Sequence, residues 1–419
     1  GLDNTFIGSK AGDAITTGSY NVAIGSQALT NDDLGNHSVA IGRMALENQN
    51  YATATNSYNV AIGSNAGNAI TTGVRNTIIG GLTGDALTDA DDNVAIGQFA
   101  LSTETSGNKT TAIGTNCLSL QNVAGDSHNV AIGYFAGYAV TSGTYNTLLG
   151  NYAGYDLETG NSNVALGYGA LSNEEDGDRN VAIGLNALEI QKNSTDTDVN
   201  NTAVGYNSGQ AISTGYRNTL IGSFSGTHGT DLTTGYSNVL VGYNTGVSAN
   251  DGRFQIVLGD TISGSEDFQV TIGKENNVIQ NEFDTDASWT RTSDQRLKTD
   301  IANAKLGLDF INDLRTVTYK WQDSTKLDKN DSQLVAAGLY NADTNHMNTT
   351  ATMHGLIAQE VKTALDKAGV DTFKGWSQDS NGIQKISREM YVIPLIKAVQ
   401  ELSAKITTLE AEITKLKGE

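Results

Sequence analysis

A segment at the start of the C-terminal third, RTSDQRLKTDI (residues 291–301), places a serine and a lysine five residues apart. A serine hydroxyl is a weak nucleophile until a neighbouring base accepts its proton. A lysine amine can be that base only if burial or nearby positive charge lowers its pKa from about 10.4. Ser293 is therefore a candidate nucleophile and Lys298 its candidate base, with Arg296 as a source of charge. On spacing alone the alternative stays open that Ser293 caps a helix beginning at Asp294 and that Lys298 is solvated.

Paired carboxylates, the pattern of general acid and base catalysis, occur at Asp91/Asp92 and at Glu174/Glu175. Such chemistry needs one carboxyl group whose pKa is raised by an apolar pocket. Both pairs fall in polar stretches between apolar blocks, so we predict solvated loops rather than a glycan-cleaving site.

No metal site or cofactor is expected. The histidines show no ligand spacing, and loop or surface positions are predicted for His37, His128, His228, His346 and His354. Cys117 replaces a repeated alanine, which indicates a small buried side chain. Four tyrosines that follow a repeat glycine could stack on sugars, but covering the edge of a coil is the favoured interpretation. They are Tyr134, Tyr168, Tyr206 and Tyr243.

The elements on the two sides of the serine–lysine segment differ. Before it, a five-residue block such as NVAIG recurs, most often at a spacing of 17 residues, as from Gly8 to Gly25. A short fixed period indicates a solenoid whose coils are stable only when stacked. The block glycines are Gly8, Gly25, Gly42, Gly63, Gly80, Gly97, Gly114, Gly133, Gly150, Gly167, Gly184, Gly205, Gly222 and Gly242, with looser copies at Gly259 and Gly273.

Each block is predicted to be a strand, because it is β-branched or small and is bounded by Asn and Gly. Alternation places Val22 and Ile24 on one face and Ala23 on the other. Both faces are apolar, as in a strand buried on two sides. One face can line the coil interior, so we expect copies of the chain to pack together through the small Ala positions. Stacking also brings leading asparagines, such as Asn59 and Asn76, close enough for an amide ladder.

The spacing lengthens at every fourth coil, to 21, 19 and 21 residues, within ENQNYATATNSYN, SLQNVAGDSHN and EIQKNSTDTDVNN. We therefore expect loops to protrude at a regular four-coil interval. The sixteen block glycines, at about 4.8 Å per coil, predict a shaft roughly 75 Å long.

Residues 293–419 have the composition of an ordinary mixed domain. LGLDFINDL (306–314) and GLIAQEVKTALDKAG (355–369) are predicted as amphipathic helices, and RTVTYKWQD (315–323) alternates like a strand. Apolar residues then recur at spacings of 4 and 3, which predicts a coiled coil but does not by itself establish a trimer. They are Leu395, Val399, Leu402, Ile406, Leu409, Ile413 and Leu416.

Charge is distributed unevenly along the 419 residues, whose formal net charge is −20. Residues 1–292 hold 10 Lys/Arg and 29 Asp/Glu, a net charge of −19, whereas residues 293–419 hold 16 and 17. An acidic shaft repels nucleic acid and anionic membranes, so neither is an expected partner. The first residues already carry the repeat and no signal peptide, so a fragment or a processed product is expected.

The Asn/Ser-Val-Ala-Ile-Gly blocks resemble the head repeats of trimeric autotransporter adhesins, the YadA-like head, over about residues 1–275. This resemblance implies a trimeric left-handed parallel β-roll. The Ser-Asp-x-Arg-Leu-Lys core, HGLIAQEV (354–361) and ISREMYVIPLIKAVQEL (386–402) resemble the endosialidase-type intramolecular chaperone of phage tail fibres and tailspikes. In that family the domain trimerises the fibre as it folds and then cuts the chain before the motif serine. Over about residues 288–419, the resemblance implies Ser293 as nucleophile, Lys298 as base and Thr292–Ser293 as the scissile bond.

These features predict a mainly β protein: a trimeric parallel β-roll or β-solenoid shaft with a C-terminal α+β chaperone domain that ends in a coiled coil. The expected boundaries are a solenoid shaft over 1–275 and a linker over 276–292. They are followed by a chaperone and auto-processing domain over 293–392 and a coiled-coil tail over 393–419.

The expected function is that of a tail-fibre or tailspike-like shaft on a virion, which binds a host cell-surface receptor, either a glycan or an outer-surface protein. The alternative is a bacterial adhesin with the same architecture at the cell surface. In both cases the chain is a homotrimer without membrane insertion. The expected enzymatic act is one serine endopeptidase cleavage of the chain itself, with no external substrate.

Overall fold

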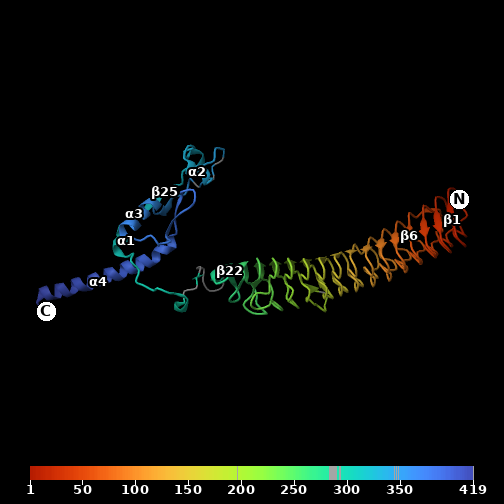
Figure 1. Cartoon of the computed structure of the whole chain (residues 1–419), viewed down its shortest axis with the longest axis horizontal. Helices are drawn as coiled ribbons and strands as arrows, with labels where there is room; N and C mark the ends of the chain where they lie inside the picture. The colour runs from red at the N-terminus through yellow and green to blue at the C-terminus, as the bar shows by residue number, and fades with distance from the viewer. Residues whose placement is uncertain are drawn as a thin grey trace. The chain divides into compact units, whose positions relative to one another are not determined.

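The computed structural model describes residues 1–195, 197–282, 290–291, 294–343, 345, 347 and 349–418. The chain divides into two compact units, Gly1–Ser293 and Asp294–Glu419. Figure 1 shows stacked coils in the first unit, and helices with short strands in the second. Across the described residues, no helix is both long enough and apolar enough to cross a membrane.

The first unit is a parallel β-solenoid in which each coil contributes one short strand to a continuous ladder (Figure 1). Its parallel strands are β1 Thr5–Ile7, β2 Val22–Ile24, β4 Val39–Ile41, β6 Val60–Ile62, β7 Thr77–Ile79, β8 Val94–Ile96, β9 Thr111–Ile113, β10 Val130–Ile132, β11 Thr147–Leu149, β12 Val164–Leu166, β14 Val181–Ile183, β16 Thr202–Val204, β17 Thr219–Ile221, β18 Val239–Val241, β20 Ile256–Asp260 and β22 Gln269–Lys274. Neighbouring strands pair block to block, so that Val22 lies beside Val39 and Ala23 beside Ala40. The predicted mainly β fold with a parallel solenoid is confirmed.

The ladder ends in antiparallel pairing. β23 (Asn277–Glu282) pairs with β22, and β24 (Thr290–Arg291) pairs with β23. Val278 of β23 is partly buried against the apolar core of the solenoid, which gives this strand its packing. Part of the segment 276–292, for which the sequence predicts a linker, therefore extends the sheet of the shaft.

A glycine closes each strand because successive coils approach closely there. Gly25 has a φ of 134°, a region that residues with side chains rarely adopt. A Cβ at this position would lie 2.5 Å from the carbonyl oxygen of Gly42 in the next coil. Any side chain would collide with the neighbouring backbone, which explains why the block ends in glycine.

Strand alternation places the alanines inside the coil. Ala23 and Ala40 are fully buried within a single chain, while the Val and Ile on either side of them are only partly covered. A coil of 17 residues encloses little space, so a small inward side chain packs against residues such as Leu29 and Leu46. The prediction that copies of the chain pack through the Ala positions is therefore wrong. The Val and Ile positions face outward instead.

Asparagine side chains form the predicted ladder inside the solenoid. The backbone N–H of Asn76 donates to Oδ1 of Asn59 at 2.9 Å, and that of Asn93 donates to Oδ1 of Asn76 at 3.0 Å. Nδ2 of Asn59 donates in turn to the carbonyl oxygen of Gly73 at 2.7 Å. These buried amides satisfy backbone groups at the point where each coil turns into its strand.

At every fourth coil a carboxylate takes an interior position that holds glutamine in the next coil and an apolar residue in coils such as those of Ile70 and Leu87. Each carboxylate is fully buried and accepts a hydrogen bond from a glutamine in the next coil. The pairs are Asp32–Gln49 at 2.7 Å, Glu104–Gln121 at 3.0 Å and Glu174–Gln191 at 2.5 Å. Glu174 also accepts the backbone N–H of Gly177 at 2.9 Å. The prediction of a solvated Glu174 is wrong, because its side chain turns into the coil interior rather than out of the loop.

Short second ladders mark the same long coils. β3 (Gly35–Asn36) pairs with β5 (Thr55–Asn56), and β13 (Gly177–Asp178) pairs with β15 (Thr197–Asp198). An isolated bridge joins Asn108 to Asp126 in the long coil between them. A further pair, β19 (Thr245–Gly246) with β21 (Ile262–Ser263), lies near the end of the shaft. The longer loops thus recur at the predicted interval and are held by backbone pairing.

The second unit combines helices with two small antiparallel sheets. Its elements are η1 Gln295–Leu297, α1 Leu308–Asn312, β25 Val317–Tyr319, η2 Ser324–Lys326, α2 Ser332–Ala336, β26 Met353–Gly355, α3 Ala358–Ala368, β27 Trp376–Gln378, β28 Gln384–Ile386, η3 Arg388–Tyr391 and α4 Val392–Lys417. The helices predicted within 306–314 and 355–369 and the strand within 315–323 are present in shorter form. Gly369 ends α3 in a left-handed conformation, with a φ of 62°.

A small apolar core holds α1, α3 and the start of α4 together. It contains Leu306, Phe310, Val361, Ala364, Leu365 and Tyr391. The backbone N–H of Leu308 at the start of α1 also donates to Oε2 of Glu401 on α4, at 2.8 Å. This hydrogen bond lowers the pKa of the Glu401 carboxyl group. The first third of α4 is thus fixed to the unit, while the rest of the helix extends beyond it.

Candidate functional site

The segment after the predicted scissile bond forms a single turn of 3-10 helix. η1 begins after Asp294, whose carboxylate accepts the backbone N–H of Arg296 at 2.8 Å. The capping residue is therefore Asp294 and not the serine before it. Thr292 and Ser293, the two residues of the predicted bond, lie outside the described residues.

Lys298 follows η1 in an extended conformation, and its side chain is exposed. Arg296, the expected source of positive charge, forms an ion pair with Asp294, with Nη2 2.7 Å from Oδ2. The Arg296 guanidinium holds the pKa of the Asp294 carboxyl group below its usual range. The positive charge of Arg296 is therefore already balanced by the Asp294 carboxylate. In one chain Lys298 is exposed and the charge of Arg296 is paired with Asp294, so the described structure does not supply the burial that lowers the pKa of a lysine base.

Two apolar side chains flank this lysine without cover from their own chain. Leu297 is 73% exposed and Ile301 is 64% exposed. Burying these side chains against another surface would also remove water from around the Lys298 amine. The segment therefore offers a way to couple assembly to the state of the candidate base.

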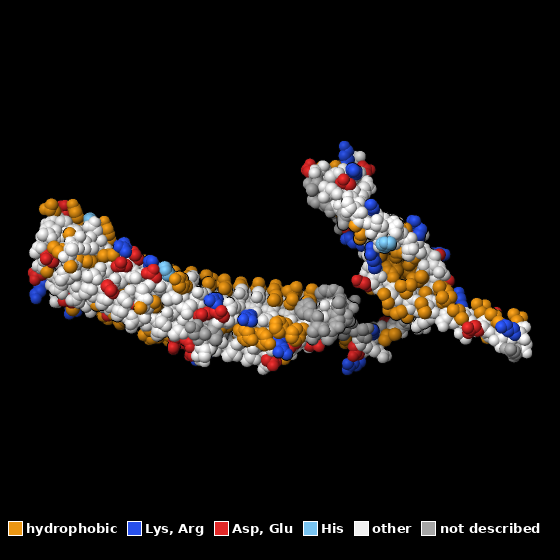
Figure 2. Space-filling model, turned by 180° about the vertical axis from the view of Figure 1, so that it is seen from behind, with side chains coloured by type: hydrophobic (Ala, Val, Ile, Leu, Met, Phe, Trp, Pro, Cys, Tyr) orange, Lys and Arg blue, Asp and Glu red, His pale blue; other side chains and the backbone are white. Residues whose placement is uncertain are grey.

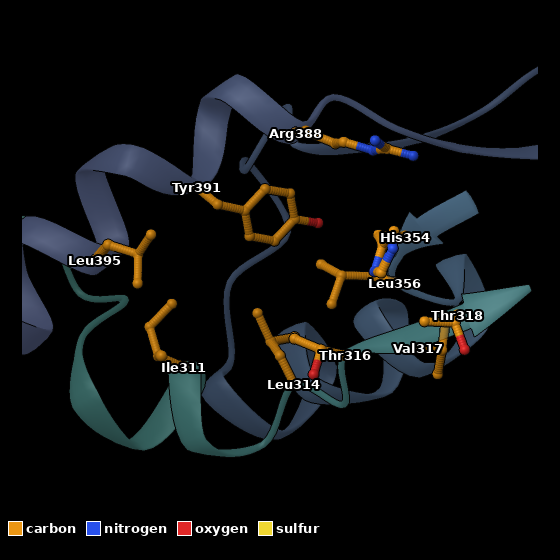
Figure 3. A pocket seen from close by; sticks show the side chains of 11 residues that line it. Ile311, Leu314, Thr316, Val317, Thr318, His354, Leu356, Arg388, Tyr391 and Leu395 are labelled. Carbon is orange, nitrogen blue, oxygen red and sulfur yellow. The ribbon is translucent and has the colours of Figure 1, made fainter. Parts of the chain in front are cut away.

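An open apolar cavity of about 700 Å³ lies between α1, β25, β26 and the start of α4 (Figure 3). Ile311, Leu314, Leu356 and Leu395 point toward one another across it, beside the ring of Tyr391. Such a lining favours apolar side chains as occupants.

Polar groups stand at one end of this cavity. Figure 3 shows His354 from β26 and Arg388 from η3 on the side away from Leu395. The Tyr391 hydroxyl donates to the carbonyl oxygen of Gly375 at 3.3 Å. Burial raises the pKa of Tyr391 to about 12, so this hydroxyl keeps its proton at neutral pH and serves as a structural donor.

α4 carries an uncovered apolar seam. From Leu402 onward every described residue of this helix is exposed, including Ile406, Leu409 and Ile413. Leu395 begins the seam and also lines the cavity, so the two form one continuous apolar surface. A helix with such a seam is typical of a coiled coil whose partners are other chains.

The shaft has an uncovered apolar surface of its own, which we call the outer strip. It consists of the first residue of each ladder strand, Val, Thr or Ile, and the third residue, Ile, Leu or Val, from β2 to β20. Ile132, Leu166 and Ile221 in the strip are each about 40% exposed. Figure 2 shows hydrophobic side chains that follow one another in a line along the shaft. A contiguous apolar surface of this length marks an interaction site.

The sequence analysis missed the interior carboxylates and the cavity. Aligning the coils on their glycines would have revealed the carboxylates, because the seventh residue after the glycine is Ile70 or Leu87 in some coils and Glu104 in another. No spacing along the chain indicates the cavity, because Ile311, Leu356 and Arg388 come from three separate elements.

In the described part of the chain, no group of three or more His, Cys, Asp or Glu is placed to hold a metal ion. His37 stacks between Tyr20 and Tyr58 on the surface, with centroid distances of 4.9 and 5.1 Å. Cys117 is fully buried, as predicted. His346 lies outside the described residues.

Comparison with known proteins concerns the second unit. A family model described as chaperone of endosialidase matches residues 293–370, from the candidate nucleophile to the turn after α3. No curated protein and no solved structure matches the chain. The C-terminal resemblance is confirmed for residues 293–370, whereas the resemblance of the shaft to YadA-like heads stays a prediction.

Proposed function

We propose that the chain forms the shaft of a homotrimeric adhesion fibre whose C-terminal unit drives assembly and then cuts itself off before Ser293. The observation that carries this proposal is the outer strip of the shaft, together with the seam of α4. Both surfaces are linear and repetitive, so identical chains can pair along them in register. The similarity of residues 293–370 to chaperones of endosialidase supports the role in assembly.

Three chains are proposed because both parts of the sequence resemble trimeric proteins. The YadA-like repeats and the endosialidase-type motif each imply a trimer, whereas the α4 seam, with Ile or Val alternating with Leu, by itself leans toward two helices. The proposed location is a virion tail or a cell surface, where the shaft would bind a host receptor. The acidic character of residues 1–292 supports a role away from nucleic acid.

Cleavage is proposed to follow assembly. In the trimer, partner surfaces would cover Leu297 and Ile301 and remove water from Lys298, which favours its neutral amine. The amine could then accept the proton of Ser293, whose oxygen attacks the carbonyl carbon of Thr292. The C–N bond breaks, the proton passes to the amino group of Ser293, and water hydrolyses the resulting ester. The products are a shaft of residues 1–292 and a C-terminal fragment of residues 293–419.

A denaturing gel tests this proposal on the full chain. The wild type is expected to give the shaft and a fragment of 127 residues, while Ser293→Ala and Lys298→Ala remain uncut but trimeric. Lys329→Ala removes another exposed lysine of the same unit and should be cut like the wild type. A wild-type trimer that stays as uncut as Ser293→Ala would show that the motif serves assembly alone.

A further inference from the structure

Six aromatic rings gather on neighbouring coils of the shaft, and two of them, Tyr134 and Tyr168, lie two residues beyond the strip residues Ile132 and Leu166. They are Tyr134, Phe135, Tyr138, Tyr152, Tyr155 and Tyr168, and their neighbouring ring centroids lie 4.4 to 5.9 Å apart. Tyr134 and Tyr168 are 45% and 55% exposed, and the other four rings are half-buried. These residues, which we call the aromatic cluster, form one continuous surface in contact with water.

The repeat itself indicates that the solenoid does not need these rings. Five of the six residues occupy the first, second and fifth positions after Gly133 and the second and fifth after Gly150. Four coils earlier, the corresponding five positions after Gly63 and Gly80 hold Ser, Asn, Asn, Leu and Asp on the same kind of backbone. Phenylalanine recurs at the second position of two other coils, as Phe99 and Phe224, but their neighbours at the fifth position are Ser102 and Thr227. Closing a coil therefore does not explain the cluster.

The backbone makes aromatic residues unfavourable at the second position. Phe135 and Tyr152 have φ angles of 55° and 59°, in the left-handed region that disfavours bulky side chains. Asparagine, which tolerates this conformation, holds the same position at Asn65 and Asn116. Aromatic side chains that occupy a backbone conformation unfavourable to them indicate that they serve a purpose other than folding of the coil.

The phenol hydroxyl groups of the cluster form no hydrogen bond to a protein atom within the described residues. Within the described residues, the tyrosine hydroxyls that hydrogen-bond to protein atoms are those of Tyr51, Tyr236 and Tyr391, none of which belongs to the cluster. The five cluster phenols thus remain available to donate to and accept from a ligand.

The charge around the cluster excludes a strongly anionic ligand. No Lys or Arg occurs between Lys109 and Arg179, while Asp156 and Glu158 are close in the sequence to the cluster. An acidic sugar would meet the field of a shaft with a net charge of −19, and Lys192, the cation that interacts with Asp156, is already paired with Glu175. An uncharged ligand with apolar faces and many hydroxyl groups fits both the rings and the phenols.

We propose that the aromatic cluster binds a neutral polysaccharide. Its sugar rings pack against the exposed faces and edges of Tyr134, Tyr152 and Tyr168, whose planes cross at 86° and 72°, and its hydroxyl groups bond to the phenols. These three tyrosines lie in successive coils, with centroids 5.7 and 5.8 Å apart, so the sugar chain runs along the shaft. The inference rests on the proposed function, because it names the chemical class of the receptor that the shaft would bind.

The test uses the full-length trimer and an immobilised panel of glucan, mannan and galactan oligosaccharides, with a matched panel that carries sialic or uronic acids. The trimer is expected to bind at least one neutral probe and to bind the acidic probes more weakly. Replacing both Tyr134 and Tyr152 by Ala should lower the affinity about tenfold or more, as for aromatic anchors at interfaces. Tyr58→Ala is the control, because Tyr58 is 53% exposed and stacks on His37 elsewhere on the shaft.

The double variant with Phe in place of Tyr134 and Tyr152 keeps the rings and should lose only the part of the affinity due to the hydroxyl groups. A trimer that binds none of the neutral probes, or that prefers the acidic panel, overturns the inference and leaves the proposed assembly intact. A double Ala variant that loses its trimeric mass assigns the cluster to assembly and also overturns it. A monomeric wild-type chain would instead contradict the proposed function.

Discussion

The shaft and the C-terminal unit both leave apolar side chains in water, but they differ in what supports those side chains. In the shaft, Ile132 and its counterparts stand on a ladder whose backbone pairing and Ala-lined interior are complete within one chain. In the C-terminal unit, every described residue of α4 from Leu402 onward is exposed. Stacked coils can hold one another before a partner arrives, whereas an isolated helix is only marginally stable. From this difference we expect assembly to begin at α4 and the shaft to follow.

The largest effect is expected inside the coil. Ala131→Glu places an unpaired charge in the closed interior, at a cost of several kcal/mol, so the coils around it should unfold. Thermal unfolding followed by circular dichroism measures this loss, with Ala124→Glu at a nearby exposed position as the control. A variant that stays fully folded but becomes monomeric would contradict this account and would indicate that the Ala positions form the contact between chains.

The next largest effect is expected at the α4 seam. Leu402→Asp combined with Ile406→Asp puts charges where helices of different chains would meet, so trimers should fail to form during refolding. Thr407→Asp adds a charge to an exposed residue outside the seam and should refold like the wild type. The variants are compared by the fraction of trimer that each gives after refolding, measured by size-exclusion chromatography with light scattering. Equal yields would mean that assembly does not begin at this helix.

A smaller effect is expected from one position of the outer strip. Ile132 and Leu120 are both 39% exposed in a single chain, but Ile132 lies in the strip and Leu120 lies in a loop. Ile132→Asp should therefore lower the dissociation temperature of the trimer, while Leu120→Asp leaves it nearly unchanged. If both variants dissociate at the same temperature, the strip is not the contact between chains.

The smallest effect concerns the interior carboxylates. Burial raises the pKa of Asp32, so the folded shaft binds this proton more tightly than the unfolded chain. The stability from this group is present at acidic pH and is lost as pH rises through the raised pKa. Relative to Asp32→Asn, the wild type should gain about 1.4 kcal/mol of stability per unit of pKa difference between the folded and unfolded states as the pH falls. Urea unfolding at several pH values measures the stability difference between the wild type and Asp32→Asn, with Asp33→Asn as the control. A difference that stays constant with pH would contradict this prediction.

Much of the shaft could be predicted because its backbone imposes strict local demands. A glycine is required where Gly25 meets Gly42, and an asparagine is required where Asn59 contacts the next coil, so both recur visibly in the sequence. The sequence does not show which face of the strand lines the coil interior, because both faces are apolar. The choice depends on the width of the coil, which the hydrophobic pattern alone does not report. That limit produced the wrong assignment of Ala23.

The candidate site was predictable only as a motif. The spacing of Ser293 and Lys298 suggests a nucleophile and a base, but the environment of a base depends on surfaces that one chain does not supply. The exposure of Lys298 and the pairing of Arg296 with Asp294 follow from a folded segment that no local pattern describes. For the same reason, the cavity beside Leu395 has no signature along the chain.

The mass of the uncut chain in solution tests the proposed assembly most directly. Sedimentation equilibrium of Ser293→Ala avoids the complication of cleavage and reports the number of chains in each particle. We predict a single species of about 132 kDa, three times the 44.1 kDa of one chain, that does not dissociate on dilution. A stable species of 44.1 kDa would contradict the assignment of the outer strip and the α4 seam as contacts between chains.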